Sequence, residues 1–327
     1  MSNISPIDGR YKKNVSELET FFSEQALMRH RVMVEVEYLL ALVEHRSFQK
    51  TRALSKKTLN SLKGLYVEFS ADHFKQIKKI EKKTSHDVNA VVVFVSEKLK
   101  KLGRGDLVPF VHFGLTSEDI NNISYSLMTQ GAVEDVMIPS VKRVLKELKA
   151  LSKKTKSLSL LSLTHGQPAT TTTLGKELAV FVSRVEREIA LIKKMKLLAK
   201  LSGATGSYAA HRVAFPDFNW PLFSKRFIKK LGLEQSPIST QIEPGDSLAE
   251  LLHSFVRINN IFSDFSLDMW LYISRNIFVQ KNIVGEVGSS TMPHKINPIF
   301  FENAEGNLDI ANNNFSFLAS RITKSRL

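Results

Sequence analysis

The fold is decided by the stretch Asp246-Ser-Leu-Ala-Glu-Leu-Leu-His-Ser-Phe-Val-Arg-Ile-Asn-Asn-Ile-Phe-Ser-Asp-Phe-Ser-Leu-Asp-Met-Trp-Leu-Tyr-Ile-Ser-Arg-Asn276. A helix of about 30 residues is about 45 Å long, which is longer than a small domain needs. The apolar character of residues 255–273 is too broad for a single buried stripe, so we expect burial on more than one side. Charged residues such as Arg257 and Asp264 interrupt the run, which favours a buried helix of a water-soluble fold over a membrane span.

The sequence predicts two amphipathic helices before this long helix and the start of another helix after it. Apolar residues recur at helical spacing in Val141, Val144, Leu145, Leu148 and Leu151, and again in Leu178, Phe181, Val182, Val185, Ile189 and Ile192. Another helix is predicted to begin at Pro298. Several long helices indicate an elongated bundle that packs against helices of other subunits. Glycines and a proline interrupt helical sequence at residues 101–109, which are the best candidate for a domain boundary.

The predicted fold class is therefore all-α. We expect a small N-terminal helical domain at residues 1–109 and a long-helix bundle at residues 110–327, and we expect the bundle to assemble into a multi-subunit helical core. No βαβ alternation, glycine-rich dinucleotide motif or phosphate-binding loop is present in the sequence.

Composition limits the classes of function. The 327 residues are 43% hydrophobic and include no cysteine, which excludes thiol nucleophiles, disulfides and thiolate metal sites. The net charge of +14 suits an anionic small substrate or a nucleic acid. Most lysines alternate with apolar residues on helices, as in a solvated face, so we expect no nucleic-acid partner. The first residues do not resemble a signal peptide and no membrane span is apparent, so a cytoplasmic location is expected.

The segment Gly288-Ser-Ser-Thr-Met-Pro-His-Lys-Ile-Asn-Pro298 carries the strongest chemical signal. A Gly-Ser-Ser start allows a tight turn whose N–H groups point in one direction and can cradle an anion. Lys295 adds a positive charge, Asn297 adds a neutral donor, and the helix expected at Pro298 would direct its positive dipole end to the same place. The segment therefore suits a carboxylate that gains negative charge during a reaction. The alternative is an ordinary polar loop before a helix.

Further polar clusters lie between helical stretches. In Thr84-Ser-His-Asp87, the acid next to His86 is expected to raise the proton affinity of the imidazole. Thr116-Ser-Glu-Asp-Ile-Asn-Asn122 is typical of a helix start, and capping alone would explain Glu118 or Asp119. In Thr164-His-Gly-Gln-Pro-Ala-Thr170, His165 is a candidate general acid because it lies in a loop beside glycine. Asp8-Gly-Arg-Tyr11 is either a simple turn before a helix or a phosphate contact through Arg10.

Taken in order, these segments resemble the adenylosuccinate lyases of the bacterial purine-biosynthesis type, within the fumarase/aspartase superfamily. The matching segments run from Asp8-Gly-Arg-Tyr11 through Gln241-Ile-Glu-Pro244 to Gly288–Glu302. The resemblance implies elimination of fumarate from adenylosuccinate, giving AMP, and from the succinyl-aminoimidazole carboxamide ribotide of purine synthesis. It also implies a homotetramer whose active sites are shared between subunits, with no metal and no cofactor. Ser85 departs from the pattern, which has asparagine before the His-Asp pair.

The resemblance also implies the roles of individual residues. Ser289 would be the base and His165 the acid, with His86 assisting. The substrate-binding residues would be Arg10, Tyr11, Ser85, Asp87, Thr116, Ser117, Gln241, Ser290, Lys295, Asn297, Ser325 and Arg326, of which Arg10, Tyr11, Ser325 and Arg326 would hold the phosphate. A serine base requires that its alkoxide be stabilised by the loop N–H groups and Lys295.

Members of the resembled family continue beyond the position of Leu327 with a second basic segment and a small helical domain. We therefore expect the C-terminal helical domain to be absent from this chain, and its activity alone to be reduced. Two alternatives remain open. The chain could be another lyase of the superfamily, such as an argininosuccinate lyase, or it could be an inactive helical assembly protein.

Overall fold

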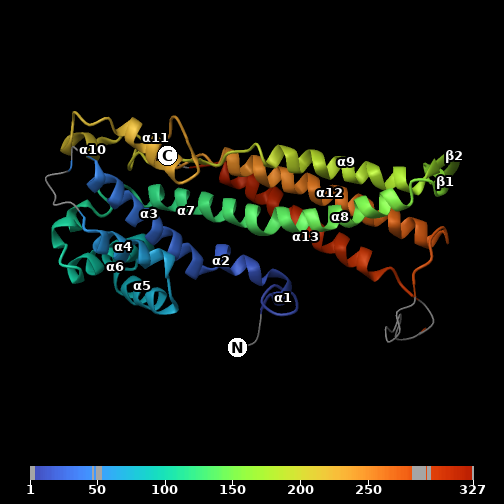
Figure 1. The fold of residues 1–327 in the computed structure, drawn as a ribbon, viewed down its shortest axis with the longest axis horizontal. Helices are drawn as coiled ribbons and strands as arrows, with labels where there is room; N and C mark the ends of the chain where they lie inside the picture. The colour runs from blue at the N-terminus through green and yellow to red at the C-terminus, as the bar shows by residue number, and fades with distance from the viewer. Residues whose placement is uncertain (1–3, 46–47, 49–53, 282–291, 293–295, 326–327) are drawn as a thin grey trace. The chain divides into compact units, whose positions relative to one another are not determined.

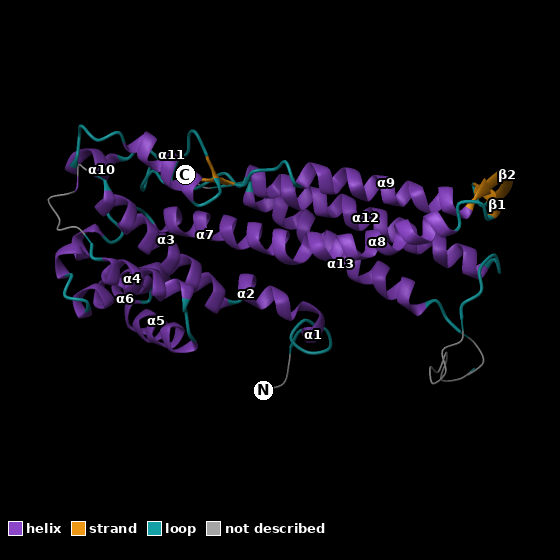
Figure 2. Ribbon diagram, in the orientation of Figure 1, coloured by secondary structure: helices purple, strands orange, loops and turns teal. Residues whose placement is uncertain are grey.

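The computed structural model describes residues 4–45, 48, 54–281, 292 and 296–325. The chain forms two compact units. The first unit contains residues 1–138 and 196–244, and the second contains residues 139–195 and 245–327. Figures 1 and 2 show that helices dominate the described part of the chain. The boundary predicted between residues 109 and 110 remains a prediction.

The first unit is built mainly from helices. Its helices and two-residue strands are α1 (Lys12–Val15), α2 (Glu19–Phe22), α3 (Glu24–Glu44), α4 (Lys56–Val67), α5 (Ala71–Thr84), α6 (Asp87–Lys101), α7 (Ser117–Ala132), β3 (Leu198–Ala199), α10 (Ala209–Ala214), α11 (Trp220–Lys230) and β4 (Glu234–Gln235). Short 3-10 helices span Ser16–Leu18 and Gly105–Phe110, and a π-helical turn spans Val133–Met137. β3 and β4 pair in parallel.

Helix α3 is the central element of the first unit. Ser23 caps it by accepting a hydrogen bond from the N–H of Ala26 at 3.1 Å, which satisfies one donor of the first turn. Its apolar side chains join a buried core with α4, α5 and α6 that includes Val32, Val36, Leu39, Leu62, Ile77, Val91, Phe94 and Leu99. The same helix buries the charged residues Arg31 and Glu35, at 3% and 0% exposure. Since buried charges need partners, α3 is the element that organises polar contacts around it.

In the described residues, the second unit contains four long helices and one β-hairpin. They are α8 (Ile138–Lys154), β1 (Ser159–Thr164), β2 (Gln167–Thr173), α9 (Leu174–Ile192), α12 (Asp246–Ser274) and α13 (Ile299–Ile322). Helices α12 and α13 pack along each other, and α9 packs on α12. Strands β1 and β2 are antiparallel, with Thr164 opposite Gln167. The long helices that the periodicity predicts are confirmed, including the helix that begins after Pro298.

One element differs from the sequence-based expectation, and one helix leaves large apolar side chains exposed. The hairpin at residues 159–173 is not predicted by the helical patterns, although its β-branched run of threonines at 170–173 suits a strand. Large apolar side chains remain exposed along α13, namely Phe300 at 70%, Ile310 at 66% and Phe317 at 64%. Among the described residues, no helix is long and apolar enough to cross a membrane.

Candidate active site

His86 forms the N-cap of α6. Its Nδ1 accepts a hydrogen bond from the N–H of Asn89 at 3.2 Å, so in this geometry Nδ1 carries no proton. The neutral ring therefore carries its proton on Nε2, on a side chain that is 51% exposed. The local fold thus presents His86 as a hydrogen-bond donor to whatever binds outside the helix.

Asp87 is engaged with a buried arginine. Its Oδ2 lies 2.8 Å from Nη2 of Arg31, and its Oδ1 accepts from the N–H of Val88 at 2.8 Å. Burial alone would raise the pKa of Asp87, but the charge of Arg31 and these hydrogen bonds outweigh burial and lower the pKa. The distance from Asp87 Oδ1 to His86 Nδ1 is 3.6 Å, and an ion pair there would need a proton on the nitrogen that serves as the cap. The charge of Asp87 therefore acts mainly on Arg31.

Arg31 connects two of the predicted clusters. Its Nε donates to Oδ1 of Asn121 at 2.9 Å, while its Nη2 holds Asp87. The Thr84–Asp87 cluster and the Thr116–Asn122 cluster are therefore joined through one side chain of α3. Ser85, between α5 and α6, has a φ of 52°, in the left-handed region where asparagine and glycine are favoured.

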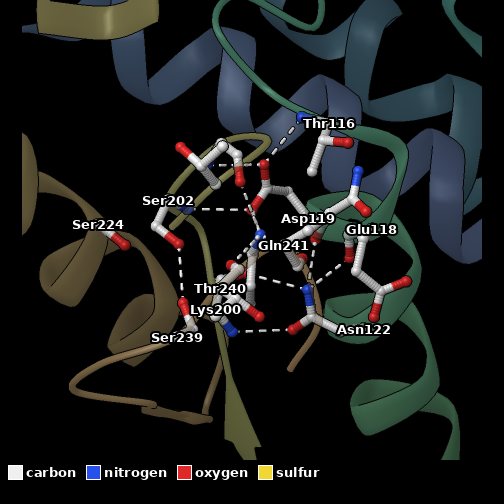
Figure 3. A network of polar contacts seen from close by, with 12 residues as sticks. Thr116, Glu118, Asp119, Asn122, Lys200, Ser202, Ser224, Ser239, Thr240 and Gln241 are labelled. Carbon is white, nitrogen blue, oxygen red and sulfur yellow. Dashed lines mark hydrogen bonds and ion pairs between the residues drawn. The ribbon is translucent and has the colours of Figure 1, made fainter. Parts of the chain in front are cut away.

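The Thr116–Asn122 cluster begins α7, as its capping pattern predicts. Asp119 is fully buried, and its carboxylate accepts from the N–H of Thr116 at 2.9 Å. It also accepts from the N–H of Ser202 at 3.0 Å and of Gly203 at 3.1 Å. Figure 3 shows these contacts converging on the first turn of α7. Asp119 is therefore more than a cap, since it joins the helix start to the loop after β3.

Lys200 completes this network from the opposite side. Its side chain is 0% exposed, and its Nζ lies 3.1 Å from Oδ1 of Asp119. The same ammonium donates to the carbonyls of Gly203 at 2.9 Å, Thr240 at 3.4 Å and Gln241 at 2.7 Å (Figure 3). The predicted substrate-binding residues Thr116, Ser117 and Gln241 thus belong to one connected structure.

Glu118 projects from the first turn of α7, beside this network. Burial raises the pKa of Glu118 to about 7, the charge of Lys200 opposes the shift, and the charges of Asp119 and Glu243 add to it. A carboxyl group that exchanges its proton near neutral pH therefore lies two residues after Thr116, close enough to interact with Lys200 and Glu243. Such shifted groups gather at functional sites, although structural networks shift them as well.

A second acid–base pair lies immediately before the cluster. Nδ1 of His112 lies 2.6 Å from Oε1 of Glu35, a carboxylate with 0% exposure. Burial alone lowers the pKa of His112, but the hydrogen bond and charge of Glu35 outweigh burial and raise it, with a smaller contribution from Asp119. None of the described residues donates a hydrogen bond to Oε2 of Glu35.

His165 lies in the second unit, in the two-residue turn between β1 and β2. Both turn residues have positive φ, 53° for His165 and 71° for Gly166, as the tightest hairpin turns require. Arg275, at the C-terminal end of α12, donates from Nη1 to the carbonyl of Gly166. The imidazole of His165 is therefore exposed on a turn that two strands and one arginine hold in place.

Of the segment with the strongest sequence signal, only Met292 and residues 296–298 are described. Ser289, Ser290, Lys295 and Arg326 lie outside the described residues. Gln280, ahead of the segment, donates from Nε2 to the carbonyl of Ile296 at 3.2 Å. Asn297 follows directly and is half-buried. Arg275 and Gln280 are five residues apart, so their contacts tie both the His165–Gly166 turn and Ile296 to the chain around the end of α12.

The remaining predicted binding residues lie near the chain ends. Arg10 is exposed and belongs to a turn in which the N–H of Tyr11 donates to the carbonyl of Pro6 at 2.9 Å. Helix α1 follows at Lys12, so the alternative of a turn before a helix is confirmed for the backbone. Ser325 is exposed after α13. Among the described residues, no group of three or more acidic and histidine side chains could hold a metal ion.

The structure therefore groups the predicted residues by unit. The first unit holds Arg10, Tyr11, Ser85, His86, Asp87, Thr116, Ser117 and Gln241, and the second holds His165, Asn297 and Ser325. Sequence reasoning missed Lys200, Arg31 and the His112–Glu35 pair. The sequence carries a signal for Lys200, a lone lysine between apolar residues in Leu197-Leu-Ala-Lys-Leu201. The buried charges on α3 leave no such signal, because their partners are distant in sequence.

The sequence of this chain is similar to those of known lyases. The family described as "Lyase" matches residues 9–309. The chain is 43% identical over 327 residues to the adenylosuccinate lyase of Escherichia coli strain K12, covering 100% of this chain and 72% of that protein. It is 45% identical over 334 residues to the adenylosuccinate lyase of Dictyostelium discoideum, with the same shares covered.

Solved structures support the fold. A fumarate lyase from Mesorhizobium sp. BNC1 matches with a TM-score of 0.72 and 18% identity, covering 95% of this chain and 66% of that one. The 3-carboxy-cis,cis-muconate lactonizing enzyme of Pseudomonas putida matches with a TM-score of 0.72 and 19% identity, covering 95% and 67%. The chain thus spans about two thirds of the length of these structures, and its all-α fold is confirmed. On these matches, the chain belongs to the lyase family and, within it, to the adenylosuccinate lyases.

Proposed function

We propose that this chain is a carbon–nitrogen lyase that eliminates fumarate from adenylosuccinate, giving AMP, and from succinyl-aminoimidazole carboxamide ribotide. The observation that carries the proposal is the 43% identity to the Escherichia coli adenylosuccinate lyase along the whole of this chain. Both substrates carry a phosphate and two carboxylates. The net charge of +14 favours the approach of such anions through long-range attraction.

His165 is proposed as the general acid. In the elimination, a base removes a proton from the carbon next to a carboxylate, the carbon–nitrogen bond breaks, and an acid protonates the departing nitrogen. His165 is exposed on the hairpin turn, and histidine titrates in the range that proton transfer at neutral pH needs. His86 assists as a donor through Nε2, because its Nδ1 is occupied by the helix cap.

Ser289 is proposed as the base, with Lys295 stabilising its alkoxide and the charge that develops on the carboxylate. Ser290 and Asn297 would add hydrogen bonds to the same group. Thr116, Ser117 and Gln241 would bind the carboxylates or the base and ribose, and Ser85 and Asp87 would flank His86. Arg10, Tyr11, Ser325 and Arg326 would bind the phosphate, which arginine grips in bidentate fashion.

The active site is proposed to form in a homotetramer, with each site shared between subunits, in the cytoplasm. The exposed apolar side chains of α13 support assembly, since apolar patches on long helices mark protein contacts. On α12, Trp270 is 42% exposed and Leu267 is 48% exposed, so this helix also leaves apolar side chains uncovered. A light-scattering mass near that of a single 36.9 kDa chain at micromolar concentration would contradict the tetramer.

The test is fumarate release from adenylosuccinate, compared with His165→Gln and with His253→Gln as the control. His253 is exposed on α12 and has no proposed role, so its variant should keep the activity of the unchanged chain. Loss of a general acid should slow turnover by about 10²-fold or more. No fumarate from adenylosuccinate, or faster release from argininosuccinate, would overturn the proposed substrate. Normal turnover by His165→Gln would overturn the role of His165.

A further inference from the structure

The network around Lys200 is a buried polar structure of the first unit. Lysine has three N–H donors, and here they face four acceptors, namely the Asp119 carboxylate and the carbonyls of Gly203, Thr240 and Gln241. Neither Lys200 nor Asp119 has more than 1% exposure. The ammonium is therefore satisfied entirely by the protein.

Stability alone is a weak reason for such a pair. Removing two charges from water is costly, and a well-packed apolar pair of similar volume often stabilises a protein as well or better. An apolar pair, however, could not bind backbone groups. Lys200 binds carbonyls of the Thr240–Gln241 segment, and Asp119 binds the N–H groups of Thr116, Ser202 and Gly203.

The three segments joined in this way lie far apart in sequence and are irregular where they meet. Residues 236–244 contain no helix or strand, so the carbonyls of Thr240 and Gln241 lie outside any helix or sheet hydrogen-bond ladder. The Gln241 carbonyl and the Thr116 N–H instead bind opposite members of one ion pair (Figure 3). Their positions are consequently fixed relative to each other.

We propose that Lys200 and Asp119 are positioning residues that set the relative placement of Gln241 and the Thr116–Ser117 helix start for substrate binding. The inference rests on the proposed function of those binding residues. Neither member of the pair touches the substrate. The pair acts through the backbone, and displacement of binding groups by about 1 Å is enough to weaken a site strongly.

The decisive variant removes both charges together as Asp119→Asn with Lys200→Met, which avoids an unpaired buried charge. We expect KM for adenylosuccinate to rise about tenfold or more, with kcat changing less, because the acid and base of the reaction are untouched. The matched control is Glu37→Gln with Lys230→Met, which removes an ion pair of 3.1 Å elsewhere in the same unit. The control should leave KM unchanged.

Asp119→Asn with Lys200→Gln is the conservative companion, because it restores an amide donor without charge. Its KM should lie between those of the unchanged chain and the methionine pair. Equal KM values for the glutamine and methionine pairs, or an unchanged KM in both, would overturn the proposal even if both variants unfold more easily in urea.

Hydrogen exchange gives a readout that needs neither turnover nor a folded variant. In the unchanged protein, binding of AMP with fumarate should slow exchange at the N–H groups of Ser202 and Gly203, which contact Asp119. Unchanged exchange there, with ligand bound, would overturn the positioning role. An unchanged chain that binds these ligands but releases no fumarate would overturn the proposed function instead.

Discussion

Glu35 Oε1 lies 2.6 Å from His112 Nδ1, so a fully buried carboxylate holds an imidazole that is 21% exposed. The contact joins the middle of α3 to the residue four positions before Thr116, at the approach to the α7 cluster. A histidine that is oriented by a buried carboxylate has one defined ring nitrogen, Nε2, left for other partners.

Glu35→Gln should destabilise the protein by about 1.5–3 kcal/mol at pH 6, the range for a hydrogen bond to a charged group. The folded pKa of His112 is raised, so its contribution is fully present below the unfolded pKa of about 6.5 and is lost as the pH rises through the folded pKa. Urea unfolding at pH 6 and pH 9 measures this. Glu17→Gln, on an exposed residue, is the control, and an equal loss at both pH values would contradict the coupling.

Glu118→Gln should depend on pH in the same direction, but as a gain in stability at high pH. The folded pKa of Glu118, about 7, exceeds the ordinary value of 4.5, so the folded state holds a proton that the unfolded state releases. Stability therefore falls as the pH rises from 4.5 past 7. The glutamine variant should match the original chain near pH 5 and unfold at higher urea concentration at pH 8. For the control Glu97→Gln on α6, the difference in stability from the original chain should be the same at pH 5 and pH 8.

Ser85→Asn should stabilise the protein by a few tenths to about 1 kcal/mol. Ser85 has a φ of 52°, and asparagine tolerates the left-handed region better than serine. Thermal unfolding measures the change. Ser183→Asn, on the exposed face of the regular helix α9, should give no gain, because asparagine is no better than serine there. A gain in both variants would show that the left-handed backbone is not the cause.

Gly166→Ala should lower both stability and turnover. Its φ of 71° disfavours a side chain by about 1–2 kcal/mol, and an added Cβ would lie 3.2 Å from Nη2 of Arg275. The turn would shift His165, so kcat should fall while binding is less affected. Gly306→Ala is the control, because nothing lies within 4 Å of its Cβ position and alanine favours a helix interior. A normal kcat in Gly166→Ala would show that the conformation of this turn does not control turnover.

The helices were predictable because their apolar periodicity is local. The stripes at 141–151 and 178–192 and the run at 246–276 appear as α8, α9 and α12. The hairpin at 159–173 escaped prediction, since its strands are exposed on most positions and give no strict alternation of apolar and polar residues. The turn of the hairpin consists of His165 and Gly166, and both residues have a positive φ. Only the glycine is a sequence signal for such a turn.

The site was predictable only where chemistry is concentrated in short segments. His86, Thr116 and His165 stand in such segments, and their roles remain proposals. Lys200 and Arg31 act over long sequence separations, 41 residues from Lys200 to Gln241 and 90 from Arg31 to Asn121. No local pattern specifies those partners. The expected effect of Asp87 on His86 stays a prediction, and the structure adds Arg31 as a second partner of Asp87.

The first unit is made of two stretches, with residues 139–195 between them belonging to the other unit. During synthesis on a ribosome, Asp119 therefore emerges long before the lysine that neutralises it and the loop that both hold. At ordinary elongation rates the delay is on the order of ten seconds. During that time the start of α7 carries the carboxylate of Asp119 without Lys200, and burying an unpaired charge has a high free-energy cost. The nascent first unit should consequently stay open and be a target for chaperones until Gln241 leaves the exit tunnel.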